Sequence, residues 1–168
     1  GRKVEEVIVV SNATVLIGLA KIGKLDLLPG IFSKVYIPEE VFKELVPERS
    51  KKPGSWEIEK AEWIERKSVT GQTEVRLLMA SLDQGEAEVL VLGKEMKADL
   101  ILLDEEKARK AAAIASFEVM GLVGLLILAK NLGLIEQVGP YIEELRRKNF
   151  RISEKIVLEG LKKAGEVG

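Results

Sequence analysis

The chain has 168 residues, 46% hydrophobic and 32% charged, and its 26 basic and 27 acidic side chains give a formal net charge of -1. This length suits one domain with a substantial core, and the balanced charge excludes a protein that coats nucleic acid through a general basic excess. The sequence contains no histidine and no cysteine, which excludes His-dependent triads, cysteine nucleophiles, disulfides and Cys/His zinc sites. Any chemistry must therefore rest on carboxylates, hydroxyls, amides, Lys and Arg.

The N-terminal part of the chain reads as a strand followed by a helix. Val7–Val10 is a continuous β-branched run, typical of a strand buried in a parallel sheet. Asn12 or Thr14 can cap the helix that follows. The apolar stretch 7–20 has the length of a signal segment, but acidic residues precede it and lysines follow it. We therefore expect a buried element and a cytoplasmic protein, and the abundance of Lys and Glu is typical of a thermophile.

The remaining pattern alternates strands with helices. A turn is expected at Pro29–Gly30, a loop over 47–55, and a turn at 83–85. The strands are expected at 34–37, 63–69, 100–103 and 117–120, and the helices at 39–46, 56–61, 86–96, 105–115, 122–131, 135–148 and 153–164. This order predicts a three-layer α/β/α fold with a parallel, doubly wound sheet, in which 1–168 form one domain and 135–168 a C-terminal helical extension.

Ligands of such folds gather at the carboxyl ends of the parallel strands. Polar residues that follow strands or open helices are therefore the candidates for a site, namely Asn12, Thr14, Glu40, Glu44, Asp83, Glu86, Glu88, Asp104 and Glu105. Clustered carboxylates repel one another unless a cation neutralises them, and oxygen ligands suit Mg²⁺ or Mn²⁺. Each acid also has a structural interpretation: Glu44 as a solvated helix residue, and Asp83 and Asp104 as helix caps.

Several motifs are distributed along the chain: VVSNATVLI at 9–17, DQGEAE at 83–88, LLDE at 102–105, the Ala108–Arg109 pair, MGLVGLL at 120–126 and FRIS at 150–153. These motifs resemble those of PIN-domain nucleases, in particular the prokaryotic DUF3368 type. Their order and spacing extend over nearly the whole chain. The resemblance implies a parallel sheet and a carboxylate cluster that binds Mg²⁺ or Mn²⁺ for cleavage of single-stranded RNA.

Carried over by position, the resemblance assigns roles to individual residues. It implies catalytic roles for Glu44, Glu86, Asp104 and Thr14, and metal binding by Asp104, Glu86, Asn12, Glu105 and Asp83. The family usually has Asp where this chain has Asn12, whose amide oxygen can bind a hard cation but brings no negative charge. A weak nuclease, a nuclease that uses Asp104, Glu86 and Asp83 instead, and an inactive module that binds RNA or a partner protein all stay open. Some relatives resemble toxins of toxin–antitoxin pairs, so a small antitoxin and a homodimer are expected partners.

Substrate contacts are expected from basic and aromatic side chains. Arg109, one helical turn beyond Asp104, can hold a phosphate or form a surface salt bridge, and Lys51 and Lys52 lie in a basic loop. The C-terminal basic residues 146–148 and 151 can be a nucleic-acid patch or a solvated face. Trp56 and Trp63 can stack on bases or anchor a helix in the core. The apolar residues Leu16, Leu19, Leu122 and Leu125 can belong to the core or to an interface.

Overall fold

The computed structural model describes residues 7–47, 54–104 and 106–167. Within these residues the chain forms a sheet of five parallel strands in the order β3-β2-β1-β4-β5. The strands are β1 (Val9–Ser11), β2 (Val35–Pro38), β3 (Ile64–Lys67), β4 (Leu100–Leu102) and β5 (Val119–Met120). β1 is central, and its Val10 pairs with Tyr36 of β2 and with Ile101 of β4.

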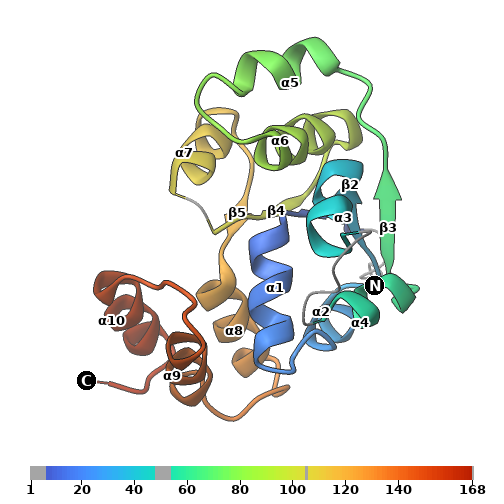
Figure 1. Cartoon of the computed structure of the whole chain (residues 1–168). Coiled ribbons are helices and arrows are strands. Elements are labelled where there is room, and N and C mark those ends of the chain that lie inside the picture. Colours follow the sequence, from blue (N-terminus) through green and yellow to red (C-terminus); the bar gives the residue numbers. More distant parts are fainter. Residues whose placement is uncertain (1–6, 48–53, 105, 168) are drawn as a thin grey trace.

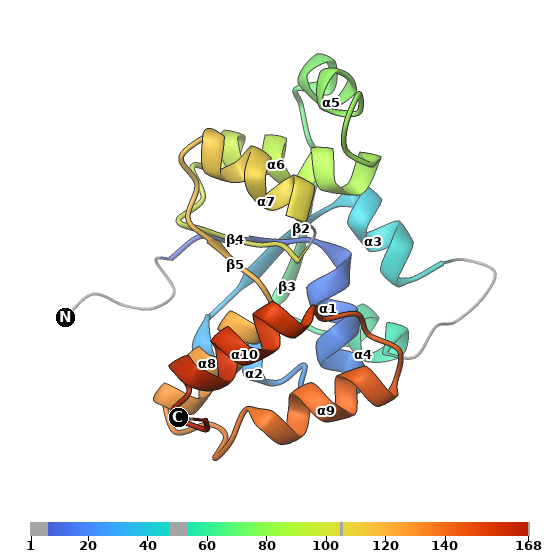
Figure 2. The same ribbon diagram turned by 90° about the vertical axis from the view of Figure 1, so that its left-hand side faces the viewer.

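Helices cover both faces of this sheet, which confirms the predicted three-layer α/β/α fold (Figure 1, Figure 2). The helices are α1 (Ala13–Lys21), α2 (Leu27–Ile31), α3 (Glu39–Leu45), α4 (Ser55–Lys60), α5 (Gln72–Leu78), α6 (Gln84–Met96), α7 (Glu106–Ile114), α8 (Leu122–Asn131), α9 (Gly139–Arg147) and α10 (Glu154–Lys163). In both views α6 and α7 lie above the sheet with α5 outside them, whereas α1 and α8 lie below it.

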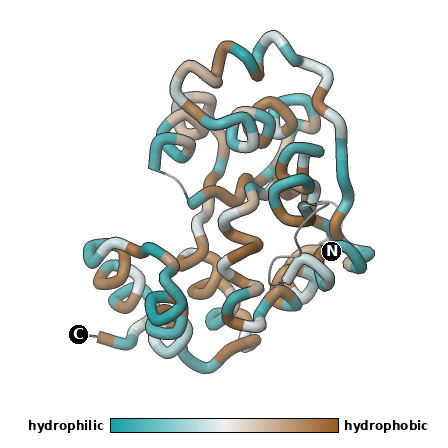
Figure 3. The backbone as a smooth tube through the Cα atoms, viewed as in Figure 1, coloured by the Kyte–Doolittle hydropathy of each residue, from teal (hydrophilic) through white to brown (hydrophobic). Residues whose placement is uncertain are grey.

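The core lies between these layers. Val9, Val10 and Ile101 of the central strands are fully buried, because helices cover both faces of a parallel sheet. In Figure 3 the hydrophobic stretches of the chain trace gather mostly toward its centre, and the hydrophilic stretches lie mostly toward its outside. Leu16, Leu19, Leu122 and Leu125 are also buried in this core. Their interpretation as core residues is therefore confirmed, and the alternative that they form an interface is wrong.

Two local expectations were wrong, and one helix was not predicted. Pro29 and Gly30 lie inside the short helix α2 and not in a turn, because a proline in the first turn of a helix removes no helical hydrogen bond. Trp56 does not anchor α4 in the core, since 63% of its surface is exposed and Lys60 lies over its ring. Helix α5 was not predicted, because Val75 is its one fully buried residue among those the structure describes.

The C-terminal helices are tied to the rest of the domain by polar contacts. The Glu166 carboxylate accepts hydrogen bonds from the backbone N–H groups of Val138 (2.7 Å) and Gly139 (2.8 Å) and from Lys130 Nζ (2.9 Å). Burial raises the pKa of Glu166, but these hydrogen bonds outweigh burial and lower the net pKa below its ordinary value. The last helices are therefore fastened to α8 and to the start of α9.

None of the helices in the described part of the chain has both the length and the apolar character needed to cross a membrane.

Candidate functional site

The candidate site lies where the order of the strands reverses. The chain passes from β1 to β2 and β3 on one side, and later to β4 and β5 on the other. The backbone N–H of Asn12, directly after β1, donates to the carbonyl oxygen of Leu102 at 3.0 Å. In open α/β sheets, the crevice at this reversal is the usual place for a ligand.

A small cavity of about 40 Å³ opens beside the end of β1. Its lining residues come from the first turn of α1, from α3 and from the start of α6, and they are Asn12, Ala13, Thr14, Val41, Glu44, Asp83, Gly85 and Glu86. The structure thus brings together five of the predicted site residues, Asn12, Thr14, Glu44, Asp83 and Glu86. The cavity has room for a small ion or a few water molecules.

Asn12 has a structural role at this cavity. It is the N-cap of α1, its side-chain oxygen accepts from the backbone N–H of Val15 at 3.1 Å, and only 3% of its surface is exposed. Asn is among the preferred capping residues because its short side chain reaches these N–H groups. The amide oxygen that could bind a cation is therefore already engaged by the helix.

Asp83 and Glu86 form a capping box at the start of α6. Asp83 Oδ1 accepts from the backbone N–H of Glu86 at 2.8 Å, and Glu86 Oε1 accepts from the backbone N–H of Asp83 at 3.2 Å. This arrangement satisfies exposed N–H groups at the positive end of the helix dipole. Both acids therefore cap the helix and line the cavity at the same time.

Glu44 reaches this helix start from α3. Its carboxylate lies so close to Gly85 that a Cβ atom added at Gly85 would overlap Glu44 Oε1 and approach Asp83 Oδ1 to 3.5 Å. Gly85 therefore allows Glu44 to lie against the first turn of α6. Sequence reasoning did not single out Gly85, although a glycine in the first turn of a long helix is a signal, because glycine is a poor helix former.

Glu88 lies behind the cavity and not in its wall. It is 6% exposed, and it accepts from the backbone N–H of Glu40 (3.4 Å) and from Gln84 Nε2 (3.3 Å). The buried carboxylate connects α6 to the start of α3. It therefore helps to hold Glu44 opposite Gly85.

Asp104 does not line the cavity. Its Oδ1 accepts from the backbone N–H of Leu122, the first residue of α8, at 3.1 Å. The N-cap of that helix is Gly121, which has no side chain to cap with, and a Cβ atom there would lie 2.7 Å from Asp104 Oδ1 and 3.4 Å from Arg109 Nη1. Asp104 thus serves as the cap of α8, with half-buried Arg109 beside it.

The other candidate residues are distributed as follows. Glu105, Lys51 and Lys52 lie outside the described residues. Of the C-terminal basic residues, Arg146 pairs with Glu154, and Lys148 donates to the carbonyl oxygen of Lys21. These two side chains therefore join the end of α9 to α10 and to the end of α1.

The oxygen atoms around the cavity are of the kind that binds a hard cation, but they are not arranged to hold one. Carboxylate and amide oxygens are the ligands that Mg²⁺ and Mn²⁺ prefer. Among the residues that the structure describes, however, no group of three or more acids is placed to hold a metal ion. A cation that binds here would require the capping side chains to turn toward it.

The chain matches the model of a known family. The model of the DUF3368 family, described as a PIN domain, matches residues 8–166. No curated protein matches the chain. The family match confirms the resemblance found in the sequence motifs, and it extends from β1 to the C-terminal helices.

Proposed function

Because the chain belongs to the DUF3368 family of PIN domains, we propose that it is an endoribonuclease that cleaves single-stranded RNA with Mg²⁺ or Mn²⁺. The family itself suggests a nuclease-like function. The observation that carries the proposal is the cavity at the end of β1, where acids from α3 and α6 meet Asn12 and Thr14. Acids from separate segments at the point of strand reversal are a chemically specific arrangement.

We assign different roles to the residues of the cavity. A divalent cation, when bound, activates water and stabilises charge on the phosphoryl group. Glu44, Asp83 and Glu86 would hold that cation, and Asn12 would add a neutral oxygen. Thr14 lines the same cavity and offers a hydroxyl that can orient water. Asp104 is the further acid of the family pattern, and Arg109 beside it is our candidate for holding a phosphate. We assign Glu105 the metal-binding role that the resemblance implies, and Lys51 and Lys52 the substrate contacts expected of a basic loop.

A second candidate function is a PIN-like module that binds RNA or a partner protein without cleaving it. One observation favours it: the side-chain oxygen of Asn12 caps α1, and Asp83 and Glu86 cap α6. These contacts give the three side chains a purely structural use. Binding would then depend on the surface of the domain and not on a cation.

Cleavage of labelled single-stranded RNA in Mn²⁺ or Mg²⁺ separates the two candidates. We expect Glu44→Gln to reduce the rate by about 10²-fold or more, whereas the matched control Glu159→Gln, an exposed acid of α10, leaves it unchanged. EDTA should abolish cleavage. Cleavage that survives both EDTA and Glu44→Gln would refute the metal–carboxylate proposal, and RNA binding without cleavage would favour the second candidate.

The family resemblance also leads us to propose that the protein is the toxin of a toxin–antitoxin pair, inhibited by a small antitoxin protein. Induced expression should arrest the growth of a bacterial host, and Glu44→Gln should relieve the arrest. Arrest by the Glu44→Gln protein would mean that toxicity does not come from this cavity.

A further inference from the structure

The loop 148–153, which joins α9 to α10, lies against the side of α1 that leads to the acid cavity. Thr14, Gly18 and Lys21 follow one another at intervals of four and three residues, so they share one side of α1. Thr14 lines the cavity. At the other end of the helix, Lys21 Nζ donates to the carbonyl oxygen of Lys148 at 2.9 Å, and Lys148 Nζ donates to that of Lys21 at 2.6 Å. The loop therefore starts beside the end of α1 that is far from the cavity.

From there the chain turns back along α1 toward the cavity. Asn149 follows the C-cap of α9 with a positive φ of 64°, a conformation that Asn adopts more easily than most residues. Phe150 then reaches the middle of α1, because a Cβ atom added at Gly18 would lie 2.9 Å from Phe150 Cε2. Gly18 is about 6 Å along the helix axis from Thr14. Figure 2 shows the chain between α9 and α10 passing beside α1. The next residue, Arg151, therefore continues toward the turn of α1 that carries Thr14.

The same loop lies beside the start of α8. A Cβ atom added at Gly18 would also lie 2.5 Å from Leu122 Cδ2, so Leu122 and Phe150 pack against the same glycine. Leu122 is the first residue of α8, and its N–H donates to Asp104. Phe150 thus lies between two helices whose first turns carry candidate site residues. Arg151 follows it on the side of the acid cavity that α1 and α8 form.

The charge of Arg151 is not used within the described part of the chain. Arg146 and Lys148 form ion pairs with acids of α10 and α9. Arg147 and Arg151 are both exposed, and neither forms an ion pair with a residue that the structure describes. Arg147 precedes Lys148, near the end of α1 that is far from the cavity, whereas Arg151 lies on the cavity side. Of the C-terminal basic residues, Arg151 is therefore the one both placed and unpaired for a ligand at the cavity.

The backbone on both sides of Arg151 is held in place. The N–H of Phe150 donates to the carbonyl oxygen of Leu145 at 2.9 Å, and Arg146 Nη2 donates to that of Ile152 at 3.5 Å. Ser153 then caps α10 through its hydroxyl. A side chain on a fixed backbone loses less conformational entropy when it binds a ligand.

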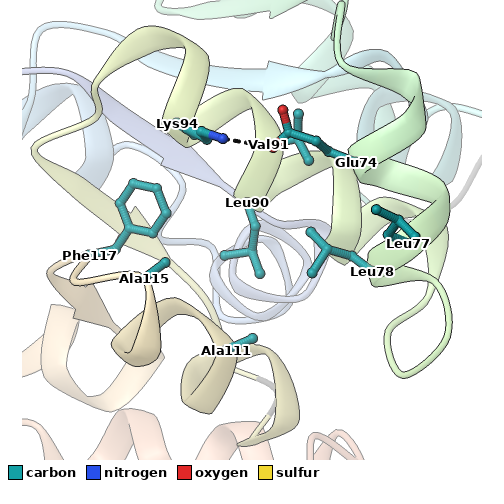
Figure 4. A pocket seen from close by; sticks show the side chains of 9 residues that line it. All are labelled: Glu74, Leu77, Leu78, Leu90, Val91, Lys94, Ala111, Ala115 and Phe117. Carbon is teal, nitrogen blue, oxygen red and sulfur yellow. Dashed lines mark hydrogen bonds and ion pairs between the residues drawn. The ribbon is translucent and has the colours of Figure 1, made fainter.

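A larger cavity, of about 470 Å³, does not offer such a cation. It lies among α5, α6 and α7, and it shares no lining residue with the acid cavity (Figure 4). Its lining includes Lys94, which lies 3.0 Å from Glu74 in an ion pair that Figure 4 draws as a dashed line. The positive charge at this cavity is therefore already balanced within the chain.

We propose that Arg151 binds a backbone phosphate of the RNA strand, next to the acid cavity and on its α1–α8 side. The assignment rests on the proposed function, since it supplies an RNA contact for the same cavity. A guanidinium presents paired N–H donors that match a phosphate group, and Arg151 can present them without breaking an ion pair of the described chain. The acids of the cavity repel phosphate, so a cation beside them is needed to hold the strand there.

Binding of labelled single-stranded RNA in EDTA, followed by fluorescence anisotropy at several salt concentrations, tests Arg151 apart from cleavage. Arg151→Gln should weaken binding about tenfold or more. It should also reduce the slope of log K against log salt concentration by about 0.7, the value for one phosphate contact on a single strand. Arg151→Lys keeps the charge and should keep the slope. Arg147→Gln is the matched control, because Arg147 is equally exposed and unpaired within the described residues, and it should bind like the wild type.

Cleavage in Mn²⁺ by the same variants separates this assignment from the nuclease function. Arg151→Gln should raise KM about tenfold and leave kcat nearly unchanged, whereas Glu44→Gln should lower kcat and keep the salt dependence of binding. A chain that binds RNA through Arg151 but does not cleave it would refute the nuclease and support the assignment. Cleavage in which Arg151→Gln changes neither KM nor the salt slope, or in which Arg147→Gln loses as much binding, would overturn the assignment and leave the nuclease standing.

Discussion

Substitution of Gly85 by alanine tests whether Glu44 acts from the position that the structure gives it. The added Cβ atom would occupy the space of Glu44 Oε1, whereas its distance of 3.5 Å to Asp83 Oδ1 is an ordinary contact. Glu44 ends a flexible side chain, so its carboxylate can turn away while the backbone stays in place. The expected change is thus a displaced acid in an intact fold.

The expected effect on stability is small and the expected effect on function is large. Alanine stabilises a helix by about 0.5–1 kcal/mol relative to glycine. Moving the Glu44 carboxylate away from the positive end of α6 costs about 0.3–1 kcal/mol. These contributions offset each other, so the melting temperature should shift by no more than about 2–4 °C. Displacement of a catalytic group by about 1 Å can cost about 10²-fold in rate.

The assay combines RNA cleavage, Mn²⁺ affinity by calorimetry and thermal unfolding. Gly85→Ala should lose cleavage and Mn²⁺ affinity together, and the shorter acid in Gly85→Ala/Glu44→Asp should restore part of both. Gly30→Ala is the control, because a Cβ atom there would meet Leu134 Cδ1 at 3.6 Å, an ordinary contact. Unchanged cleavage and affinity in Gly85→Ala, or a double variant without any recovery, would refute this role for Glu44.

Three further predictions use the capping contacts. Asp104→Asn keeps an acceptor for the N–H of Leu122 and should unfold like the wild type, whereas Asp104→Ala should lose about 1 kcal/mol in urea unfolding; equal losses would contradict the cap. Asn12→Asp places a charge at a residue that is 3% exposed, so it should lower the melting temperature in EDTA. Mn²⁺ at a hundredfold excess over its Kd for the variant should add about 2.7 kcal/mol of stability, and the same Mn²⁺ concentration should add less to the wild type; a calorimetric scan with no such gain would argue against a cation here. Burial raises the pKa of Glu166, but its hydrogen bonds outweigh burial and lower the pKa below its ordinary value. The contribution of Glu166 to the free energy of unfolding is therefore complete above the ordinary pKa of a glutamate and is lost as the pH falls below it. Glu166→Gln should lower the free energy of unfolding by about 2 kcal/mol at neutral pH and make it less dependent on pH in the acid range.

The sequence was most informative where local pattern and burial agree. The β-branched run at 7–10 could be read as a central strand because helices on both faces of a parallel sheet require continuous apolar residues. Asn12 was recognisable as a cap from its type and place, and the structure has it capping α1. Helix α8 begins and ends where the apolar run 122–131 predicts.

Contacts between distant segments were beyond the reach of local patterns. Asp104 caps a helix that begins 18 residues later. The motif around Asp104 does not indicate that the N-cap residue of that helix, Gly121, has no side chain to accept the hydrogen bond. The carboxylate of Glu95, on α6, accepts from the backbone N–H groups of Thr70 (3.1 Å) and Gly71 (2.7 Å), which directly precede α5. Only the tertiary structure brings these partners together, so sequence spacing alone could not predict either contact.

The capping contacts also explain how acids can gather in a protein without histidine or cysteine. Carboxylates that share a small space repel one another, but here Asp83, Glu86 and Glu44 lie at the positive end of the α6 dipole, and Asp104 at that of α8. The positive ends of these helices thus offset part of the repulsion among the carboxylates, which a bound cation would otherwise have to neutralise. Under the proposed function, a cation would have to compete with these caps. The neutral amide of Asn12 adds no negative charge to the cavity, so it reduces the repulsion among the acids, and it would also weaken the attraction for the cation. The capping contacts thus let the cavity keep its shape without a cation.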